Sequence, residues 1–227
     1  MSGLFLISLL LLHANARAGI IANGSFELFQ AGADGGAGRS VYIVGTHTTS
    51  INGWTLSGIG DVYLHHTPAI GNTIGANFNF AQDGNTYLDL SGGVGGGTSG
   101  QHATMFQDFA TVANQTYSLS FFSGAAFSPS ATINVQIVGA NPILNETVTA
   151  AAPGANISWS PHLYNFLADS SSARLSFRDL SGNDDNVSFV DNVSVTAVPE
   201  PSSFLLFAVA STAFGVARVR CQRQRKT

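Results

Sequence analysis

The sequence predicts an all-β domain, an antiparallel sandwich of two sheets, between two apolar terminal segments. Three observations lead to this class. Apolar and polar residues alternate with a period of two in several short segments, as they do in strands with one buried face. Clusters of Gly, Asn, Asp and Ser separate these segments. Between the termini, no stretch shows the 3.6-residue apolar stripe of an amphipathic helix. Many short, half-buried strands are typical of a sandwich.

The N-terminal segment has the pattern of a secretory signal peptide. Residues 4–12 form an apolar run that is too short to cross a bilayer, and two small-x-small cleavage sites follow, Ala14-Asn15-Ala16 and Ala16-Arg17-Ala18. We therefore expect export, removal of residues 1–18 and a mature chain that starts near Gly19.

The strands are expected in residues 19–197, the segment between the two termini. The alternation is clearest at residues 117–121, 132–137 and 174–178, where Arg174 and Arg178 fall on the polar face. Further strands are expected at residues 20–29, 41–46, 62–65, 86–90, 104–109, 143–149, 159–167 and 187–195.

Residues 19–197 also form an acidic unit without cysteine. The unit holds twelve of the 13 acidic residues but only three of the nine basic ones, and five basic residues lie in the last ten positions. No basic surface remains for nucleic acid, so that class of partner is excluded. The single cysteine is Cys221, outside the unit, so no disulfide framework exists. The domain must depend on its core and on any ion that it binds.

The last expected strand places a carboxylate where an apolar residue would be usual. By parity, Asp191 shares a face with four apolar residues, Val187, Phe189, Val193 and Val195. A buried carboxylate must be protonated, bind a cation or accept several hydrogen bonds. Because Arg174 and Arg178 lie on the polar face of their own strand, few protein cations are available. Carboxylates and backbone carbonyls suit Ca²⁺; hydrogen bonding at a strand end is the alternative.

The C-terminal segment combines a proline motif, a short apolar run and a basic tail. Pro199-Glu200-Pro201 precedes the uncharged residues 204–217, and five basic residues follow. A helix over residues 204–217 is about 21 Å long, and one over residues 202–219 about 27 Å, against a hydrocarbon core of about 30 Å. A transmembrane helix at residues 203–219 is therefore just long enough to span the bilayer. The basic tail predicts a cytoplasmic C-terminus.

This arrangement resembles the bacterial PEP-CTERM sorting signal over residues 198–227, with Pro199, Glu200 and Pro201 at the motif itself. The resemblance implies processing near the motif by an exosortase, a membrane transpeptidase-like protease, and single-pass membrane anchoring before that step. An ordinary type I membrane anchor behind a proline-rich stalk is the alternative. A GPI signal is disfavoured, because such tails end apolar and this one ends in arginines.

Short motifs in the central segment carry a second resemblance. They are Asn23-Gly24-Ser25-Phe26-Glu27, Gly53-Trp54, residues 83–92, residues 107–109 before residues 117–121, and residues 190–195. Together they are similar to the galactose-binding-like jelly roll, over residues 20–196. That group includes many carbohydrate-binding modules and a cell-wall-associated family of unknown function in plants and bacteria.

The second resemblance also implies a metal site. In such modules, an acid after the first-strand Phe and an acid on the last strand bind a structural Ca²⁺ that ties the two chain ends together. Glu27 and Asp191 match those positions, and a backbone carbonyl near Ser25 is the implied third ligand. The 25-residue stretch between Glu27 and Gly53 departs from the family pattern, so further ligands are not carried over.

A sugar site needs an exposed aromatic ring that stacks on C–H groups, with planar polar side chains beside it. Tyr63 and Trp159 are the expected rings and His65 the expected polar neighbour. Trp54 is expected in the core, because it follows a Gly turn and the matching family position is buried.

We therefore expect an exported, envelope-anchored and non-catalytic module associated with extracellular polysaccharide. A matrix or adhesion protein that contacts other proteins is the first alternative. A hydrolase is the second, although the chain contains no G-K-[ST], G-x-S-x-G or H-E-x-x-H motif.

Overall fold

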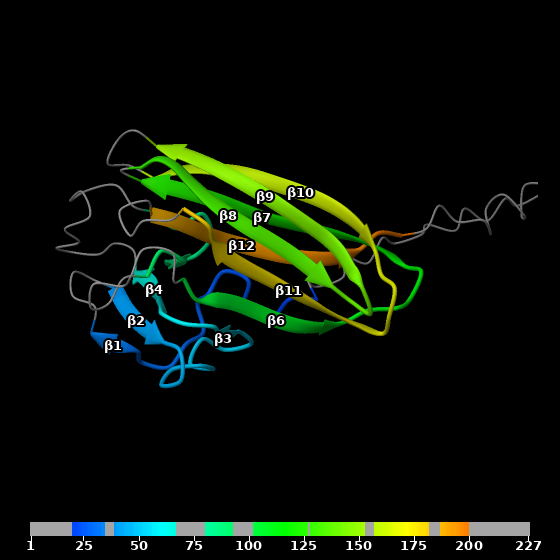
Figure 1. The fold of residues 1–227 in the computed structure, drawn as a ribbon, viewed down its shortest axis with the longest axis horizontal. Coiled ribbons are helices and arrows are strands. Elements are labelled where there is room, and N and C mark those ends of the chain that lie inside the picture. Colours follow the sequence, from blue (N-terminus) through cyan, green and yellow to red (C-terminus); the bar gives the residue numbers. More distant parts are fainter. Residues whose placement is uncertain are drawn as a thin grey trace, which may run out of the picture.

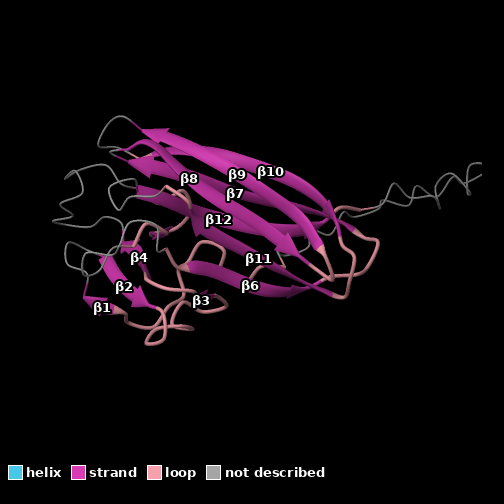
Figure 2. Cartoon of the chain, viewed as in Figure 1, coloured by secondary structure: helices cyan, strands magenta, loops and turns pink. Residues whose placement is uncertain are grey.

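A computed structural model describes residues 20–34, 39–66, 80–92, 102–126, 128–152, 157–181 and 187–199. These ranges contain strands and turns and no helix (Figure 2). The expected signal peptide, the expected transmembrane helix at residues 203–219, and Glu200 and Pro201 of the sorting motif lie outside the described residues. Over the part of the chain that is described, no helix long and apolar enough to span a bilayer is found.

In the described part of the chain, twelve strands form two antiparallel sheets (Figure 1). The seven-stranded sheet has the order β1 (Ala33–Asp34), β2 (Arg39–Ile43), β4 (Asp61–His66), β5 (Thr86–Asp89), β12 (Val187–Ala197), β7 (Thr116–Ala126) and β10 (Ser158–Leu167). The five-stranded sheet has the order β3 (Thr55–Ser57), β6 (Thr104–Ala110), β11 (Ser172–Asp179), β8 (Ser128–Val138) and β9 (Pro142–Ala152).

The eight strands from β5 to β12 wind as a jelly roll. Successive strands alternate between the two sheets, except for β8 and β9, which pair with each other as neighbours in the five-stranded sheet. The chain then returns along its own path, so that β11 lies between β6 and β8, and β12 lies between β5 and β7. This order confirms the expected antiparallel jelly-roll sandwich. Strands β1 and β3 were not expected, because two and three residues are too few to show an alternation.

The core lies between the two sheets and is rich in aromatic rings. Trp54 is 1% exposed, as expected, and its ring centroid lies 5.3 Å from that of Phe26 and 6.1 Å from that of Phe177. Phe121 of β7 meets Phe177 of β11 at 5.2 Å, edge to face, across the sandwich. With no disulfide available, this packing supplies the main stabilisation of the fold.

The expected strand at residues 20–29 does not form. Asn23 and Phe26 adopt the left-handed backbone conformation, with φ angles of 52° and 57°, which no regular strand contains. The Asn23 side chain accepts a hydrogen bond from the backbone N–H of Leu28 and donates one to its carbonyl. These local bonds hold an irregular turn where the apolar pattern alone favoured a strand.

The expected orientation of Asp191 is also wrong. The pairing of β12 with β7 shifts register between Asp191 and Ser194, and Asn192 there has a φ of 52°. The bulge adds a residue, so Val193 and Val195 face the core while Asp191 faces the opposite side of the sheet. Parity counted along the strand cannot detect such an insertion.

Candidate functional site

The outer face of the seven-stranded sheet carries a row of side chains across five strands. Residues paired directly in neighbouring antiparallel strands share a face. The registers therefore line up Tyr63 of β4, Asp89 of β5, Phe189 of β12, Gly124 of β7 and Trp159 of β10. The two aromatic rings expected from the sequence thus lie on one face, roughly 19 Å apart along the row at about 4.8 Å per strand.

A small aromatic cluster lies along this row, separate from the main core. Tyr87 and Phe189 form its buried centre, and Ala81, Ile157 and Trp159 pack against them. The Tyr87 ring lies 5.1 Å from Phe189 and 5.8 Å from Trp159, edge to face in both cases. The same ring stacks on His65 at 5.0 Å with an interplanar angle of 3°. Tyr87 therefore links His65 to Trp159.

The three expected sugar-binding residues differ in exposure. Tyr63 and Trp159 are half-buried and keep part of their surface in solvent. His65 is only 1% exposed, because it stacks on Tyr87 and places its Nε2 3.0 Å from Asp89 Oδ2. The sequence did not indicate Tyr87 as a binding residue. All four residues of β5 are buried, so this strand lacks the polar face that would distinguish an outward-facing side chain from a core one.

Trp159 is seated on the sheet by a glycine. Gly124 lies directly opposite in β7, and a Cβ there would come within 2.8 Å of both Cε3 of Trp159 and Cγ2 of Ile157. The indole N–H donates to the carbonyl of Phe80 at 3.0 Å. The ring is thus held by contacts with Gly124 and with the Phe80 carbonyl, and it keeps part of its surface in solvent.

Replacing Gly124 with alanine is expected to displace the Trp159 ring and to destabilise the fold by about 1–3 kcal/mol, as overpacking does. The displacement is measured as a shift in tryptophan emission in a Trp54→Phe background, since the chain has two tryptophans. Ser120→Ala, on the same face of β7 but away from the indole, is the control and is expected to leave the emission unchanged. An emission that Gly124→Ala does not alter would contradict the seating.

Glu27 binds the segment that leads into β5. Its Oε1 accepts hydrogen bonds from the backbone N–H of Asn85 at 2.6 Å and of Thr86 at 2.7 Å, and from Thr86 Oγ1 at 2.9 Å. Gly84 permits this approach, because it has a φ of +69° and a Cβ there would lie 2.4 Å from Oε1 of Glu27. Thr86 Oγ1 also donates a hydrogen bond of 3.2 Å to the Ser25 carbonyl.

Asp191 binds the same segment from the other side. It is 0% exposed, and its Oδ2 accepts from the backbone N–H of Gln82 at 2.7 Å and of Asp83 at 3.0 Å. Its Oδ1 accepts from Asn192 N–H at 2.7 Å. Burial, with a smaller contribution from the Asp83 carboxylate, raises the pKa of Asp191 to about 7, although the three amides lower it. The hydrogen-bonding alternative is therefore observed for this carboxylate.

The three expected calcium ligands converge on residues 82–86. Glu27, Asp191 and the Ser25 carbonyl all contact this segment, and they supply oxygen atoms of the kind that Ca²⁺ prefers. The raised pKa of the buried Asp191 indicates that no described cation offsets its desolvation. Within the described ranges, no group of three or more His, Cys, Asp or Glu side chains is arranged to hold a metal. The two carboxylates and the carbonyl therefore fit Ca²⁺ in kind and not in number.

The first and last segments of the domain are joined by backbone hydrogen bonds. Ile20 N–H donates to the Val195 carbonyl at 2.8 Å, and Val193 N–H donates to the Gly24 carbonyl at 2.9 Å. A Cβ at Gly24 would lie 1.8 Å from the Val193 carbonyl oxygen, so only glycine permits this contact. The first residues of the domain are therefore attached to its last strand.

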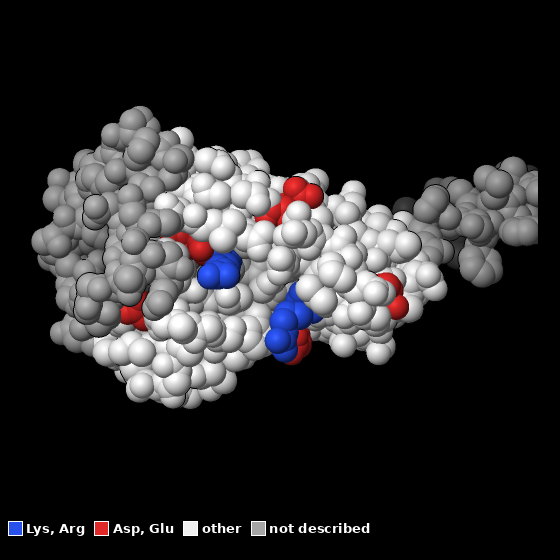
Figure 3. Space-filling model, in the orientation of Figure 1, with Lys and Arg blue, Asp and Glu red and all other residues white. Residues whose placement is uncertain are grey.

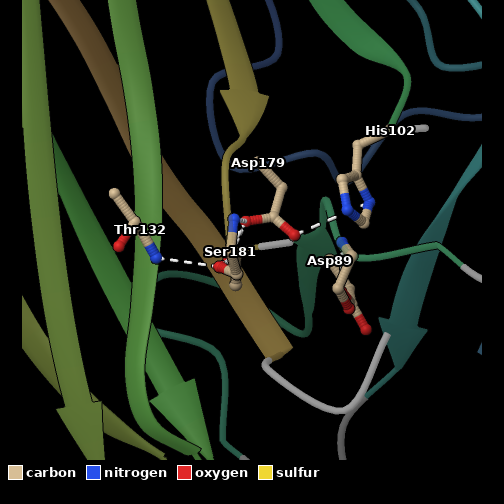
Figure 4. Close-up of polar contacts among 7 residues, drawn as sticks. Asp89, His102, Thr132, Asp179 and Ser181 are labelled. Atoms are coloured by element: carbon tan, nitrogen blue, oxygen red, sulfur yellow. Dashed lines mark hydrogen bonds and ion pairs between the residues drawn. The ribbon is translucent and has the colours of Figure 1, made fainter. Parts of the chain in front are cut away.

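A second buried polar cluster joins strand ends inside the sandwich (Figure 4). Asp179 Oδ1 accepts from the backbone N–H of Ser181 and from the hydroxyls of Ser181 and Ser188, while Asp179 Oδ2 lies 3.6 Å from Nδ1 of His102. Ser181 Oγ in turn accepts from Thr132 N–H at 2.9 Å. The cluster thus connects β8, β11 and β12. In it the serines donate to the aspartate, which is not the arrangement of an activated nucleophile.

One Ser–His contact has the distance of a nucleophile and its base. Ser123 Oγ lies 2.7 Å from Nε2 of His162. Ser123 is 0% exposed, and burial lowers the pKa of His162. Among the described residues, no carboxylate forms an ion pair with His162. A buried serine cannot reach a substrate carbonyl, and the described residues provide no acid that orients the histidine. This pair therefore does not favour a hydrolase.

Charged side chains are sparse on the face shown in Figure 3. Arg174 and Arg178 are exposed, as expected. Arg174 pairs with Asp108 through two hydrogen bonds of 2.7 Å, and its guanidinium lies 3.8 Å from the centroid of Phe106. The pairing leaves this part of the surface close to neutral.

Comparisons with known proteins agree with both sequence resemblances. A family model described as a protein of unknown function (DUF642) matches residues 19–196, and a model of the PEP-CTERM protein-sorting motif matches residues 197–220. No curated protein matches the chain.

Similar solved structures include three with modest scores. A structure described under "CBM4 structure and function" is 18% identical, with 78% of this chain and 99% of that chain covered and a TM-score of 0.44. TmCBM61 in complex with β-1,4-galactotriose is 10% identical, with coverage of 80% and 100% and a TM-score of 0.46. The K1 cleaved adhesin domain of Lys-gingipain from Porphyromonas gingivalis is 17% identical, with coverage of 65% and 92% and a TM-score of 0.46.

Proposed function

The chain belongs to the DUF642 family of proteins of unknown function, and from this premise we propose that it is a non-catalytic carbohydrate-binding module of the cell envelope. Its PEP-CTERM motif marks it as an exported, cell-surface protein. The observation that carries the proposal is the half-buried Trp159 ring, which contacts the sheet at Gly124 and donates a hydrogen bond to the Phe80 carbonyl. An indole that is seated on a sheet and keeps part of its surface in solvent is a platform on which a sugar ring can stack.

The sorting motif supports a route to the envelope. An exosortase would process the chain near Pro199, Glu200 and Pro201, and the apolar residues that follow would hold it in the membrane by a single pass until then. The match of the motif model to residues 197–220 supports this route.

A structural Ca²⁺ is part of the proposal. Glu27, Asp191 and the Ser25 carbonyl would hold it, together with further oxygens of residues 82–86. When bound, the ion would neutralise the buried Asp191 and stiffen the segment that packs beside the aromatic cluster. Support comes from the convergence of these oxygens on one segment and from the raised pKa of Asp191.

Binding to neutral polysaccharide is the expected result of the direct test. The full chain, purified in a detergent without a sugar headgroup, is incubated with insoluble polysaccharides and titrated with xylohexaose, β-1,4-galactotriose and panose. Retention on polysaccharide or saturable binding of an oligosaccharide supports the proposal. A chain that binds none of them would instead favour the second candidate, adhesion to proteins, for which Leu163 and Leu167 on the edge strand β10 are 70% and 55% exposed.

A further inference from the structure

We propose that Tyr87 and His65 are the polar recognition groups of the carbohydrate site, and that a hydroxyl of a neutral sugar reaches them beneath Trp159. This inference rests on the proposed function. It assigns the polar contacts with the sugar to two side chains that are almost completely buried.

Both side chains carry a buried polar atom without a partner. Tyr87 and His65 are each 1% exposed, and among the described residues neither the Tyr87 hydroxyl nor Nδ1 of His65 has a hydrogen-bond partner. More than nine in ten buried polar groups in proteins are satisfied. Of the five such exceptions among the described residues, these two lie on stacked rings 5.0 Å apart, at the aromatic cluster, and the other three belong to His102 and Asp179. Such a pair is expected where a ligand supplies the missing partners.

The hydrogen-bonding roles of the two atoms follow from their neighbours. Asp89 Oδ2 lies 3.0 Å from Nε2 of His65, and a carboxylate only accepts, so Nε2 donates the proton; in the neutral imidazole Nδ1 is then an acceptor. Asp89 Oδ1 is itself held by the N–H and hydroxyl of Ser91. The Tyr87 hydroxyl is protonated at neutral pH, like that of any ordinary tyrosine, and can donate.

These roles define the class of ligand. The site offers a donor on Tyr87 and an acceptor on His65, and a sugar hydroxyl can both accept and donate. The buried Asp89 carboxylate stands beside the cluster, in contact with His65, and would repel an anionic sugar. A neutral sugar therefore fits better than a uronic acid.

Trp159 covers the way to these atoms. Its ring meets Tyr87 edge to face at 5.8 Å, and its N–H donates to the carbonyl of Phe80, a residue whose side chain is 62% exposed. Entry of a sugar hydroxyl therefore requires a shift of the indole. Tryptophan emission in a Trp54→Phe background is expected to change when an oligosaccharide binds.

The first test is a change in stability without sugar. Tyr87→Phe removes only the unpartnered hydroxyl and is expected to raise Tm by about 2–4 °C. The control is Tyr117→Phe, because Tyr117 is also a buried tyrosine but its hydroxyl accepts from Val112 N–H at 2.8 Å; this variant is expected to lower Tm. If Tyr87→Phe also lowers Tm, its hydroxyl has a partner in the free protein, such as a buried water, and the inference is overturned.

The second test is affinity for xylohexaose, β-1,4-galactotriose and panose, measured on the full chain. For each oligosaccharide that the wild type binds, Tyr87→Phe is expected to weaken binding roughly three- to tenfold, while Tyr117→Phe leaves it unchanged. Equal binding by Tyr87→Phe and wild type would overturn this inference and leave the proposed function standing. A wild type that binds neither these probes nor insoluble polysaccharide would overturn the proposed function itself.

Discussion

Replacing Asp191 with alanine is expected to lower the free energy of unfolding by about 3–5 kcal/mol. The change leaves the N–H groups of Gln82, Asp83 and Asn192 without their acceptor, at a position that is 0% exposed. Urea denaturation measures the loss. Asp169→Ala is the matched control, because this exposed carboxylate also accepts from two amides, those of Ala140 and Asn141, which water can satisfy instead. A loss no larger than that of the control would contradict the account of the buried site.

The same carboxylate predicts the pH dependence of stability without calcium. Since burial raises the pKa of folded Asp191 to about 7 from a usual 3.8, the folded state retains the proton more tightly than the unfolded state. The stabilising contribution is fully present below pH of about 4 and is lost as the pH rises through about 7. Asp191→Asn is expected to flatten this part of a curve of Tm against pH measured in chelator. Parallel curves for the variant and the wild type would show that folding does not raise the pKa of Asp191.

Calcium is expected to reverse the loss of stability at higher pH, because the ion competes with the proton for the Asp191 carboxylate. At 100 times its dissociation constant, an ion that binds only the folded state adds about 2.7 kcal/mol. The gain in Tm should be larger at pH 8 than at pH 5 and should disappear in Asp191→Asn. If chelator leaves Tm unchanged at pH 8, no tightly held ion exists and the hydrogen bonds alone hold residues 82–86.

Replacing Trp159 with alanine is expected to weaken polysaccharide binding by about 2 kcal/mol, roughly thirtyfold, because the main apolar surface for the sugar is lost. Retention on insoluble polysaccharide and titration with soluble oligosaccharides measure this loss. Trp54→Phe is the matched control, since Trp54 is the other tryptophan and lies in the core at 1% exposure. The control should lose stability and keep its affinity. If Trp159→Ala binds as well as the wild type, the outer face of the seven-stranded sheet is not the sugar site.

The strand pattern could be predicted wherever one face of a strand is apolar and the other polar. Strands β7, β8 and β11 all show this alternation, and they occupy the expected positions. The pattern failed at residues 20–29, where the left-handed Asn23 and Phe26 interrupt an apolar run. It also failed for the orientation of Asp191, because a bulge changes parity without changing composition.

The sequence by itself determined that this chain folds as a cysteine-free β-sandwich, that it carries a sorting motif, and which acids end its first and last segments. These properties are local, since each is written in a few consecutive residues. Only the tertiary structure decided that Gly124 lies under Trp159, that Tyr87 stands between His65 and Trp159, and that Glu27 and Asp191 hold one segment. Those neighbours come from strands far apart in the chain, and their contacts depend on strand order and register, which alternation along a single strand does not encode.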